Sequence, residues 1–450
     1  MDLNGKKAAV LGVGKTGLAT ARFLAGRGVR MAITDAKPQS VWGEAWGTLE
    51  NLPVEWTAAP YGPEVLAGTD LVVPSPGIPP ANPILIEAVR RGIPVLSELE
   101  LASRFITTPI IAITGTNGKT TVTSLTGEML QTAGRKVWIG GNIGTPLIGY
   151  ADLPQHADWA VVEVSSFQLQ WAQTFHPRIA VLLNITADHI DYHGSFSAYR
   201  EVKERIFSRQ TARDLAILNG DEKESVTLCT NLKARTEFFR SSGPVESGIF
   251  LSGQKFVRPL HGGKTEEYPL EMVRLPGRHN CENVMAAILS ARACGCEPPA
   301  IIRAVNGFRG IAHRIEYAGE KNGIHFYDDS KGTNVGAVMR ALESFPQPVI
   351  LLLGGRDKES DFQELVPWIR RGVKEMVLFG EAAGKINGVV GGVVPTTLAP
   401  TLKEAVGKAY RSAIPGDIVL LSPGCASFDE FKDYRERGDR FREWVGELST

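Results

Sequence analysis

The chain has 450 residues, of which 43% are hydrophobic and 22% charged, and these values predict about three ordinary globular domains. The 49 Lys and Arg residues balance the 49 Asp and Glu residues. The totals therefore favour neither a nucleic-acid partner nor a membrane surface, although a balanced total can conceal a local basic cleft. The five cysteines fit no common zinc spacing, and the sequence has neither a signal peptide nor an apolar run of about 18 residues. We therefore expect free thiols, a cytoplasmic location and no membrane insertion.

The first segment alternates strands and helices. A buried-strand pattern at residues 7–12 leads into a glycine turn and a helix pattern at 17–28, and further strands are expected at 29–33 and 70–73. This alternation indicates a parallel sheet with crossover helices. We expect a Rossmann-like domain over residues 1–97.

The rest of the chain repeats this alternation twice. Strand patterns occur at residues 110–114, 159–164, 179–184, 215–219, 324–327, 349–353, 375–379 and 417–421. Residues 238–275 favour shorter, antiparallel strands, and helices are predicted over 279–293 and from residue 298. An amphipathic helix is predicted over 195–207.

The strongest chemical signal is a glycine turn between the strand at 110–114 and a helix start. Residues 115–121, Gly-Thr-Asn-Gly-Lys-Thr-Thr, direct main-chain N–H groups and the positive end of a helix toward one point, which suits a triphosphate. Lys119 would reach the terminal phosphates, and the Thr120 hydroxyl would join a Mg²⁺ ion. The Walker pattern is imperfect because Ile113 stands where it requires glycine, and an ordinary strand-to-helix turn is the alternative.

This loop completes the expected fold class. We predict three α/β domains in series, of which the second, over residues 98–311, is P-loop ATPase-like with a mostly parallel sheet. The third, over 312–450, is expected to be Rossmann-like.

Polar residues follow two further strands. Glu163 is a lone carboxylate in an apolar strand, which favours a Mg²⁺ ligand over an edge residue that faces water. Residues 165–168 form a Ser-x-x-Gln capping box. Two His and two Asp residues gather at 188–193, at a strand end where parallel sheets bind ligands. By pattern alone, Lys203 is one of several surface charges on its helix.

A second glycine loop lies near the N-terminus. Gly12, Gly14 and Gly17 match the dinucleotide pattern after a strand, and Asp35 ends the next strand. This pattern alone would suggest NAD. Close backbone approach to a helix N-terminus suits any diphosphate, however, and no residues for hydride transfer are visible. A diphosphate-bearing substrate, which could be a nucleotide sugar, is therefore favoured over a redox cofactor.

The residues by themselves predict a Mg²⁺–ATP enzyme with a second diphosphate site. A kinase, an ATP-driven ligase and an ATPase motor all meet this description. The sequence shows no further coupling elements of a motor, whereas kinase and ligase cannot be separated by pattern.

Taken together, the motifs resemble those of the Mur ligases, whose phosphate loop is also typical of folylpolyglutamate synthetase. The resemblance covers essentially the whole chain, with the motifs in the same order, at residues 115–121, 163–168, 184–189, 199–203, 313–314 and 328–334. Within the family, residues 12–17, 75–77, 141–144 and 421–431 look most similar to members that add D-glutamate to UDP-N-acetylmuramoyl-L-alanine. One mild departure is Glu359, which stands where glycine is common.

The resemblance implies an ATP-dependent amide ligase of peptidoglycan precursor synthesis, which works through an acyl phosphate and two Mg²⁺ ions. It implies that Thr120 and Glu163 hold one ion, whereas Glu163, His189 and a carbamylated Lys203 hold the other. Lys119, His189 and Lys203 are the expected catalytic residues.

The resemblance also assigns the binding residues. Those expected at ATP are Gly115, Thr116, Asn117, Gly118, Lys119, Thr120, Thr121, Asn283, Arg314 and Asp329. Those expected at the nucleotide sugar are Gly14, Lys15, Thr16, Asp35, Lys37, Ser75, Pro76, Gly77 and Asn142. The expected amino-acid substrate residues are Thr333, Lys358, Ser427, Phe428 and Tyr434. Thr333 and Ser427 could instead be turn or cap hydroxyls, Tyr434 could be plain core, and His313 could simply orient Arg314.

Three alternatives remain open at this point. The first is a ligase for another amino acid, the second an NAD-dependent oxidoreductase built on residues 12–35, and the third a nucleotide-binding module without turnover. We expect a monomer.

Overall fold

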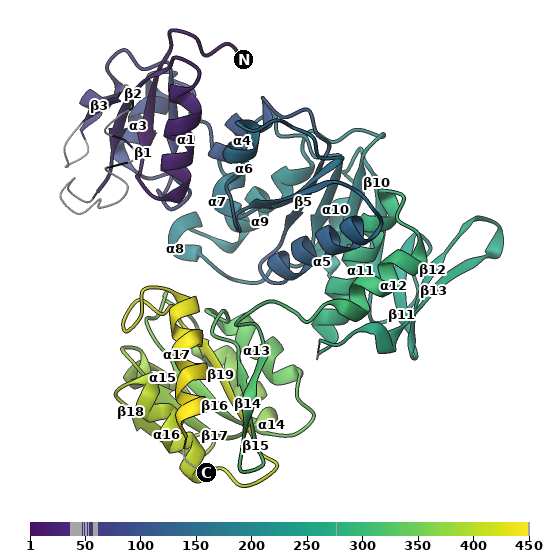
Figure 1. Cartoon of the computed structure of the whole chain (residues 1–450). Helices are drawn as coiled ribbons and strands as arrows, with labels where there is room; N and C mark the ends of the chain where they lie inside the picture. The colour runs from purple at the N-terminus through teal and green to yellow at the C-terminus, as the bar shows by residue number, and fades with distance from the viewer. Residues whose placement is uncertain are drawn as a thin grey trace. The chain divides into compact units, whose positions relative to one another are not determined.

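The computed structural model describes residues 1–36, 47, 49, 52, 54–56, 62–275 and 277–448 (Figure 1). Within these residues the strands form three sheets, of four, nine and six strands. The chain groups into two compact units, each of which is treated separately below. The first contains Met1–Ile185, Tyr192–Pro269 and Val284–Val305, and the second contains Thr186–Asp191, Leu270–Asn283 and Asn306–Thr450.

The N-terminal sheet is parallel, with strand order β3-β2-β1-β4. Its strands are β1 (Lys7–Leu11), β2 (Arg30–Thr34), β3 (Val54–Trp56) and β4 (Leu71–Pro74), and its helices are α1 (Lys15–Ala25) and α3 (Pro83–Arg90). Strand β1 is central and almost wholly buried, because its short apolar side chains pack under helices on both faces. The expected alternation is confirmed, although α1 begins at Lys15 and not at residue 17.

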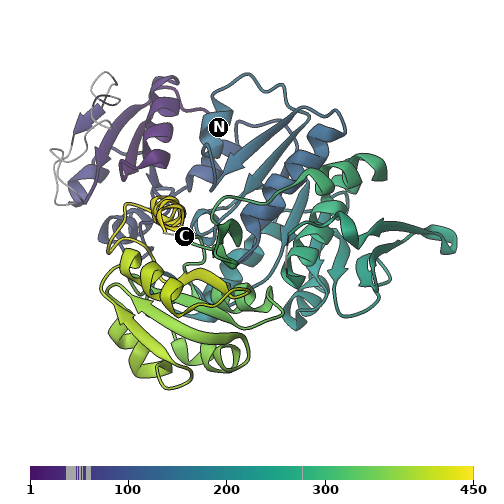
Figure 2. The ribbon, with the colours of Figure 1, turned by 60° about the horizontal axis from the view of Figure 1, so that its bottom comes forward.

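The central sheet has the order β13-β12-β11-β10-β9-β8-β5-β7-β6. Its strands are β5 (Ile110–Thr114), β6 (Val137–Gly141), β7 (Trp159–Glu163), β8 (Ile179–Leu182), β9 (Leu215–Asn219), β10 (Arg235–Arg240), β11 (Gly248–Ser252), β12 (Lys255–Pro259) and β13 (Thr265–Pro269). Strands β5 to β11 pair in parallel, whereas β12 and β13 are antiparallel. The hairpin of β12 and β13 projects from the sheet in both views (Figures 1 and 2).

Helices cover the central sheet and connect it to its neighbours in the chain. They are α4 (Glu98–Ser103), α5 (Lys119–Thr132), α6 (Leu147–Ala151), α7 (Ser166–Leu169), α8 (Ile190–His193), α9 (Phe196–Glu204), α10 (Lys223–Cys229), α11 (Arg278–Ala293) and α12 (Pro298–Gly307). The predicted capping box of α7 is present, with reciprocal bonds between Ser165 and Gln168. Because β5, β7 and β8 are neighbours and parallel, the polar residues after each strand lie at one edge of the sheet.

The C-terminal sheet has the order β14-β15-β19-β16-β17-β18, with only β14 antiparallel among these strands. The strands are β14 (Glu316–Lys321), β15 (Ile324–Asp328), β16 (Val349–Gly354), β17 (Val373–Phe379), β18 (Thr396–Ala399) and β19 (Ile418–Gly424). The helices are α13 (Val335–Glu343), α14 (Val366–Gly372), α15 (Ala383–Val390), α16 (Leu402–Ser412) and α17 (Tyr434–Glu447). Alternate residues of β16 enter two separate cores, one on each face, as expected for a strand covered on both sides.

The expected fold class, three α/β domains in series, is confirmed. All five cysteines, Cys229, Cys281, Cys294, Cys296 and Cys425, are free thiols, as expected. Among the described residues, no helix is both long and apolar enough to cross a membrane.

Candidate functional site

The phosphate loop joins β5 to α5 in the first unit. Gly118 precedes the helix with a φ of 86°, a left-handed conformation that glycine adopts at little cost. Lys119 begins the helix, and its Nζ donates to the main-chain oxygens of Gly115 and Thr116 at 2.9 Å each. This loop curls around its own lysine, which is the arrangement expected for a phosphate cradle.

Residues from the end of β8 hold the loop in place. The Asn184 side chain accepts a hydrogen bond from Asn117 N (2.8 Å) and donates one to Asn117 O (3.1 Å). The main-chain N–H of Thr116 donates to Asn184 O at 2.9 Å. Three bonds to one buried asparagine therefore fix the loop before any ligand binds, which lowers the ordering cost of binding. Asn184 lay within a predicted motif, but its side-chain role was not predicted.

Glu163 ends β7 beside the phosphate loop and is buried. Its Oε1 accepts a hydrogen bond from Asn142 Nδ2 at 2.8 Å, and its main-chain oxygen accepts from Asn142 N. Its Oε2 is also buried and has no hydrogen-bond partner among the residues that the structure describes. A buried carboxylate oxygen without a donor is costly, so this oxygen fits a cation ligand. The alternative of an edge residue facing water is wrong.

Lys203 is also buried, although its pattern alone placed it among surface charges. It lies in the last turn of α9, and its Nζ donates to the main-chain oxygen of Gly115 at 2.9 Å. The Nζ also lies 4.7 Å from the centre of the Tyr199 ring, and the Tyr199 hydroxyl is 3.0 Å from Thr116 Oγ1. The pattern failed because amphipathicity cannot identify a charge that points into a polar site.

The N-terminal glycine loop has the tight geometry that its spacing predicted. The Asp35 carboxylate accepts a hydrogen bond from Val13 N at 2.8 Å. A Cβ on Gly17 would lie 1.9 Å from the main-chain oxygen of Gly12, so the helix can approach the loop only with glycine there. Ser75 Oγ is 3.4 Å from the same oxygen, and Lys15 Nζ donates to Gly144 O.

The remaining residues predicted at the nucleotide sugar lie around this loop. Gly14 caps α1, Thr16 lies in its first turn, and Pro76 and Gly77 follow β4. Lys37 lies outside the described residues. The structure thus brings Lys15 close to the 141–144 turn, which lies far from it in the sequence.

His189 lies in the segment Thr186–Asp191, which groups with the second unit. Its φ is 55°, an uncommon conformation for a residue with a Cβ. Its main-chain N–H donates to Asp188 Oδ1 at 3.0 Å, and its Nε2 is 3.6 Å from Asp188 Oδ2. His193, which had no predicted role, lies in the first unit, 3.0 Å from Ser166 Oγ and stacked on Phe167.

Within the second unit, Asp329 follows β15 and is deeply buried. Burial raises the pKa of Asp329 to about 7, whereas the nearby Arg314 and a 2.8 Å hydrogen bond from Ser422 Oγ favour the ionised form. Burial lowers the pKa of His279 to about 3, and the cations Arg340 and Arg314 act in the same direction. Asn283 donates to Asn280 Oδ1 at 3.1 Å on the same helix.

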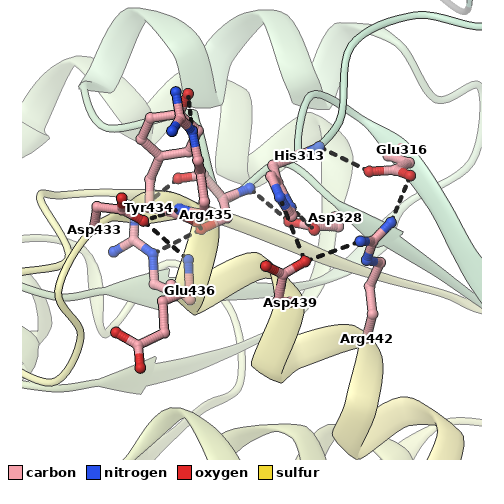
Figure 3. Close-up of polar contacts among 11 residues, drawn as sticks. His313, Glu316, Asp328, Asp433, Tyr434, Arg435, Glu436, Asp439 and Arg442 are labelled. Atoms are coloured by element: carbon pink, nitrogen blue, oxygen red, sulfur yellow. Dashed lines mark hydrogen bonds and ion pairs between the residues drawn. The ribbon is translucent and has the colours of Figure 1, made fainter.

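His313 lies in a polar cluster with residues of β14, β15 and α17 (Figure 3). Its Nδ1 is 2.7 Å from Asp328 Oδ2, and this bond raises the pKa of His313. Glu316 accepts a hydrogen bond from His313 N and another from Arg442, at 2.8 and 2.7 Å. The ligand atoms of His313, Glu316 and Asp328 lie close enough for one cation. Because Arg442 and the His313 backbone already partner Glu316, this cluster reads as a structural network.

Arg437 is a residue that sequence reasoning missed. Its side chain is fully buried and donates to Ser330 Oγ, Ser330 O, Ala426 O and Cys425 O at 2.8–3.2 Å. All four acceptors are neutral, and burial lowers the pKa of Arg437 to about 10. The guanidinium therefore joins the loop after β15 to the loop after β19. The sequence carries no signal that separates Arg437 from the exposed arginines beside it.

These two loops carry several residues predicted at the amino-acid substrate. Ser427 is buried, whereas the Phe428 side chain is 62% exposed. Tyr434 begins α17 and is only half-buried, so it is not plain core, and Lys331 Nζ lies 5.4 Å from its ring centre. Thr333 precedes the N-cap of α13, and Lys358 lies half-buried after β16. The structure thus places all five in loops or helix starts of one domain.

Three α/β domains in series, with a strand–glycine turn–helix phosphate loop in the second, define a nucleotide-binding enzyme of several domains. Three family models match the chain: a Mur ligase MurD-like N-terminal domain at residues 6–97, a Mur ligase middle domain at 113–291, and a Mur ligase glutamate ligase domain at 313–425. The chain belongs to the Mur ligase family.

Relatives in this family match over the full length. The UDP-N-acetylmuramoylalanine–D-glutamate ligase of Syntrophus aciditrophicus is 56% identical over 446 residues, which cover 99% of this chain and 98% of the relative. The ligase of the same name from Desulfosudis oleivorans is 43% identical, over 100% of this chain and 98% of the relative.

Solved structures support the fold. The UDP-N-acetylmuramate–alanine ligase of Thermotoga maritima has a TM-score of 0.61 at 18% identity, covering 98% of this chain and 99% of that one. The MurF ligase of the same organism, solved with ADP, has a TM-score of 0.60 at 14% identity, covering 86% and 91%. The predicted family is confirmed, and the protein is an ATP-dependent ligase of peptidoglycan synthesis.

Proposed function

We propose that the protein joins D-glutamate to UDP-N-acetylmuramoyl-L-alanine at the cost of ATP. The observation that carries this substrate pair is the 56% identity, over essentially the whole chain, with a ligase of that name. The oxidoreductase alternative has no support, because the N-terminal glycine loop belongs to a domain that matches a Mur ligase model.

In the proposed reaction, the γ-phosphoryl group of ATP passes to the substrate carboxylate and forms an acyl phosphate. The amine of D-glutamate then attacks the acyl carbon, and phosphate leaves. Lys119 would exchange its contacts with Gly115 and Thr116 for phosphate oxygens, because a charged phosphate binds an ammonium group more strongly than a neutral carbonyl does. The N-terminus of α5 and the loop N–H groups would bind the remaining phosphate charge.

Mg²⁺, when bound, neutralises the negative charge that gathers during phosphoryl transfer. Thr120 and Glu163 would hold one ion, because the Glu163 Oε2 atom is buried without a donor among the described residues. Glu163, His189 and a carbamylated Lys203 would hold a second ion. Carbamylation makes the Lys203 side chain an anion, which is the charge that a metal ligand needs.

The binding residues follow the same proposal. The loop 115–121 with Asn283, Arg314 and Asp329 binds ATP. The nucleotide sugar is bound by the loops at 14–16 and 75–77 together with Asp35, Lys37 and Asn142. Thr333, Lys358, Ser427, Phe428 and Tyr434 bind D-glutamate. The proposal also includes three functional domains, with boundaries near residues 97 and 311. It further includes a cytoplasmic location and a monomeric state.

The decisive experiment measures phosphate release with ATP, Mg²⁺ and UDP-N-acetylmuramoyl-L-alanine. D-Glutamate, L-glutamate and L-alanine are compared as acceptors, with a reaction lacking acceptor as the baseline. Release that depends on D-glutamate alone supports both the substrate and the reaction. Release with a different amino acid would overturn the assigned acceptor while leaving an ATP-dependent ligase.

A further inference from the structure

One segment of the chain leaves the first compact unit and returns to it. Residues Thr186–Asp191 belong to the second unit, whereas Ile185 and Tyr192 on either side belong to the first. Both flanks are anchored there, since Ile185 N donates to Glu222 Oε2 at 3.3 Å and the Tyr192 hydroxyl donates to Ile78 O at 2.9 Å. The segment that carries His189 therefore depends on the second unit for its placement.

Asn334 provides a link from the second unit to this segment. It is the N-cap of α13, and its Oδ1 accepts a hydrogen bond from Ala337 N at 2.8 Å. Its Nδ2 donates to Asp188 Oδ2 at 2.9 Å. One amide thus uses its acceptor on the helix and its donor on the segment, which an ionised Asp could not do because it has no donor, whereas Ser has a donor but a shorter side chain.

Asp188 in turn contacts both the main chain and the side chain of His189. Its Oδ1 accepts from His189 N, and the Oδ2 atom that Asn334 contacts is 3.6 Å from His189 Nε2. His189 has a φ of 55°, so its backbone needs such support to keep one conformation. The Asp188 side chain is only 12% exposed, and water therefore competes weakly for these contacts.

We propose that Asp188 and Asn334 are a positioning pair that fixes the backbone and imidazole of His189. Asn334 holds the Asp188 carboxylate, and the carboxylate holds His189. Asn334 directly follows Thr333, so the pair ties the proposed D-glutamate site to a proposed metal ligand. The catalytic meaning of the pair rests on the proposed function, whereas the pair itself rests on the contacts alone.

The chain offers variants that separate the link from the helix cap. Asn334→Asp and Asn334→Ser both keep an N-cap oxygen, but the first sets a second carboxylate against Asp188 and the second is too short to reach it. The double variant Asp188→Asn with Asn334→Asp exchanges donor and acceptor and restores the bond. Asn82→Asp is the matched control, because Asn82 caps α3 by accepting from Ile84 N at 2.9 Å.

The first readout is hydrogen exchange of the ligand-free protein, which does not depend on activity. We expect faster exchange at 186–191 in Asn334→Asp and Asn334→Ser, unchanged exchange in α13, and recovery in the double variant. Asn82→Asp should leave all of these peptides unchanged. Unchanged exchange at 186–191 in Asn334→Asp, or a change in α13 alone, would reduce Asn334 to a helix cap and overturn the proposal.

The second readout is steady-state kinetics. Losing a hydrogen bond to a charged group should lower the kcat of Asn334→Asp about 10- to 100-fold, with the KM for the nucleotide sugar unchanged. The double variant should regain part of this loss, because it restores the bond to residue 334 but not the carboxylate beside His189, and a double variant no better than Asn334→Asp would refute the pair. If the wild type shows no D-glutamate-dependent release, the proposed function fails, and the exchange data still decide the pair.

Discussion

Glu98 is a fully buried carboxylic acid at the start of α4. It accepts a hydrogen bond from Ile148 N at 2.6 Å and a longer one from Gln168 Nε2 at 3.4 Å, with no cation among the groups that shift its pKa. Burial raises the pKa of Glu98 from 4.5 to about 7. The folded protein therefore binds a proton at this site over a pH range in which the unfolded chain has released it.

This raised pKa sets the sign of a pH effect. Between about pH 4.5 and about pH 7 the free energy of unfolding should fall as pH rises, by on the order of 3 kcal/mol from Glu98. Denaturation at about pH 5 and about pH 8 should show this loss in the wild type and a smaller one in Glu98→Gln. Glu87→Gln is the control, because Arg90 and Arg91 hold the pKa of Glu87 at about 2, below this window. Equal losses in the wild type and Glu98→Gln would contradict the assignment.

Lys203 allows the proposed carbamate to be separated from a simple cation. Lys203→Ala and Lys203→Arg should each lower D-glutamate-dependent phosphate release by about 10²- to 10³-fold, since neither can supply the anionic ligand. Acetate or another short carboxylic acid should partly restore Lys203→Ala. Glu201→Ala, an exposed change on the same helix, should match the wild type. Full activity in Lys203→Arg would mean that only the positive charge matters.

At the residue scale, a buried polar side chain could be predicted where its charge differs from the apolar residues beside it in the sequence. Glu163 stands out as a charge in an apolar strand, and the structure buries it. Lys203 and Arg437 lie in helices rich in charge, so nothing in the pattern marks them as buried. Glu359, at a position where the resemblance expects glycine, has a φ of 61°, and this explains the preference for glycine there.

Helix α17 packs so closely on β15 that one of its glycines has no room for a side chain. A Cβ on Gly438 would lie 2.1 Å from His313 Nδ1 and 2.6 Å from Asp328 Oδ2. Helix α17 therefore packs directly against the His313–Asp328 pair. Any residue larger than glycine at position 438 must displace either the pair or the helix.

Gly438→Ala should accordingly destabilise the protein by about 1–3 kcal/mol. Gly446→Ala, on the same helix with open space around its Cβ, should be neutral or stabilising, by up to about 1 kcal/mol through helix propensity. Urea unfolding of both variants measures the difference. Equal stability of the two variants would show that α17 adjusts freely.

At the element scale, buried apolar strands were predictable, including the edge strand β4, whereas polar or exposed edge strands were not. The predicted strands at 110–114 and 215–219 match β5 and β9, which are buried apolar runs. Strands β14 and β18 were missed because both lie at sheet edges and carry polar or exposed residues. Their pairing depends on neighbours distant in the chain, which a local pattern does not report.

The whole molecule divides differently from its three sheets. The second unit includes two stretches, Thr186–Asp191 and Leu270–Asn283, that lie in the chain before the C-terminal sheet begins. Leu270 and Val273 line a cavity of about 510 Å³ with Leu342, Phe345 and Trp368 of that unit. The resemblance predicted three domains in series. Boundaries at single positions in the chain cannot describe these two stretches, because tertiary contacts group them with a later part of the chain.

This grouping predicts how a truncated chain behaves. In a fragment of residues 1–305, the stretches at 186–191 and 270–283 lack their partners in the second unit and should exchange hydrogen much faster than in the full chain. Helix α5 and the phosphate loop, whose contacts with Asn184 are retained, should keep their protection. Mass spectrometry of the two proteins compares these peptides. Equal exchange at both stretches would show that the first unit alone orders them.

The hydrogen bond between Asp188 and Asn334 also depends on the order in which the two residues are translated. The two residues are 146 positions apart, so a ribosome releases the first long before the second. A nascent chain can thus complete its phosphate loop while the segment of His189 still lacks its anchor. If the pair positions His189 as proposed, we expect the catalytic site to be complete only after Asn334 has been translated.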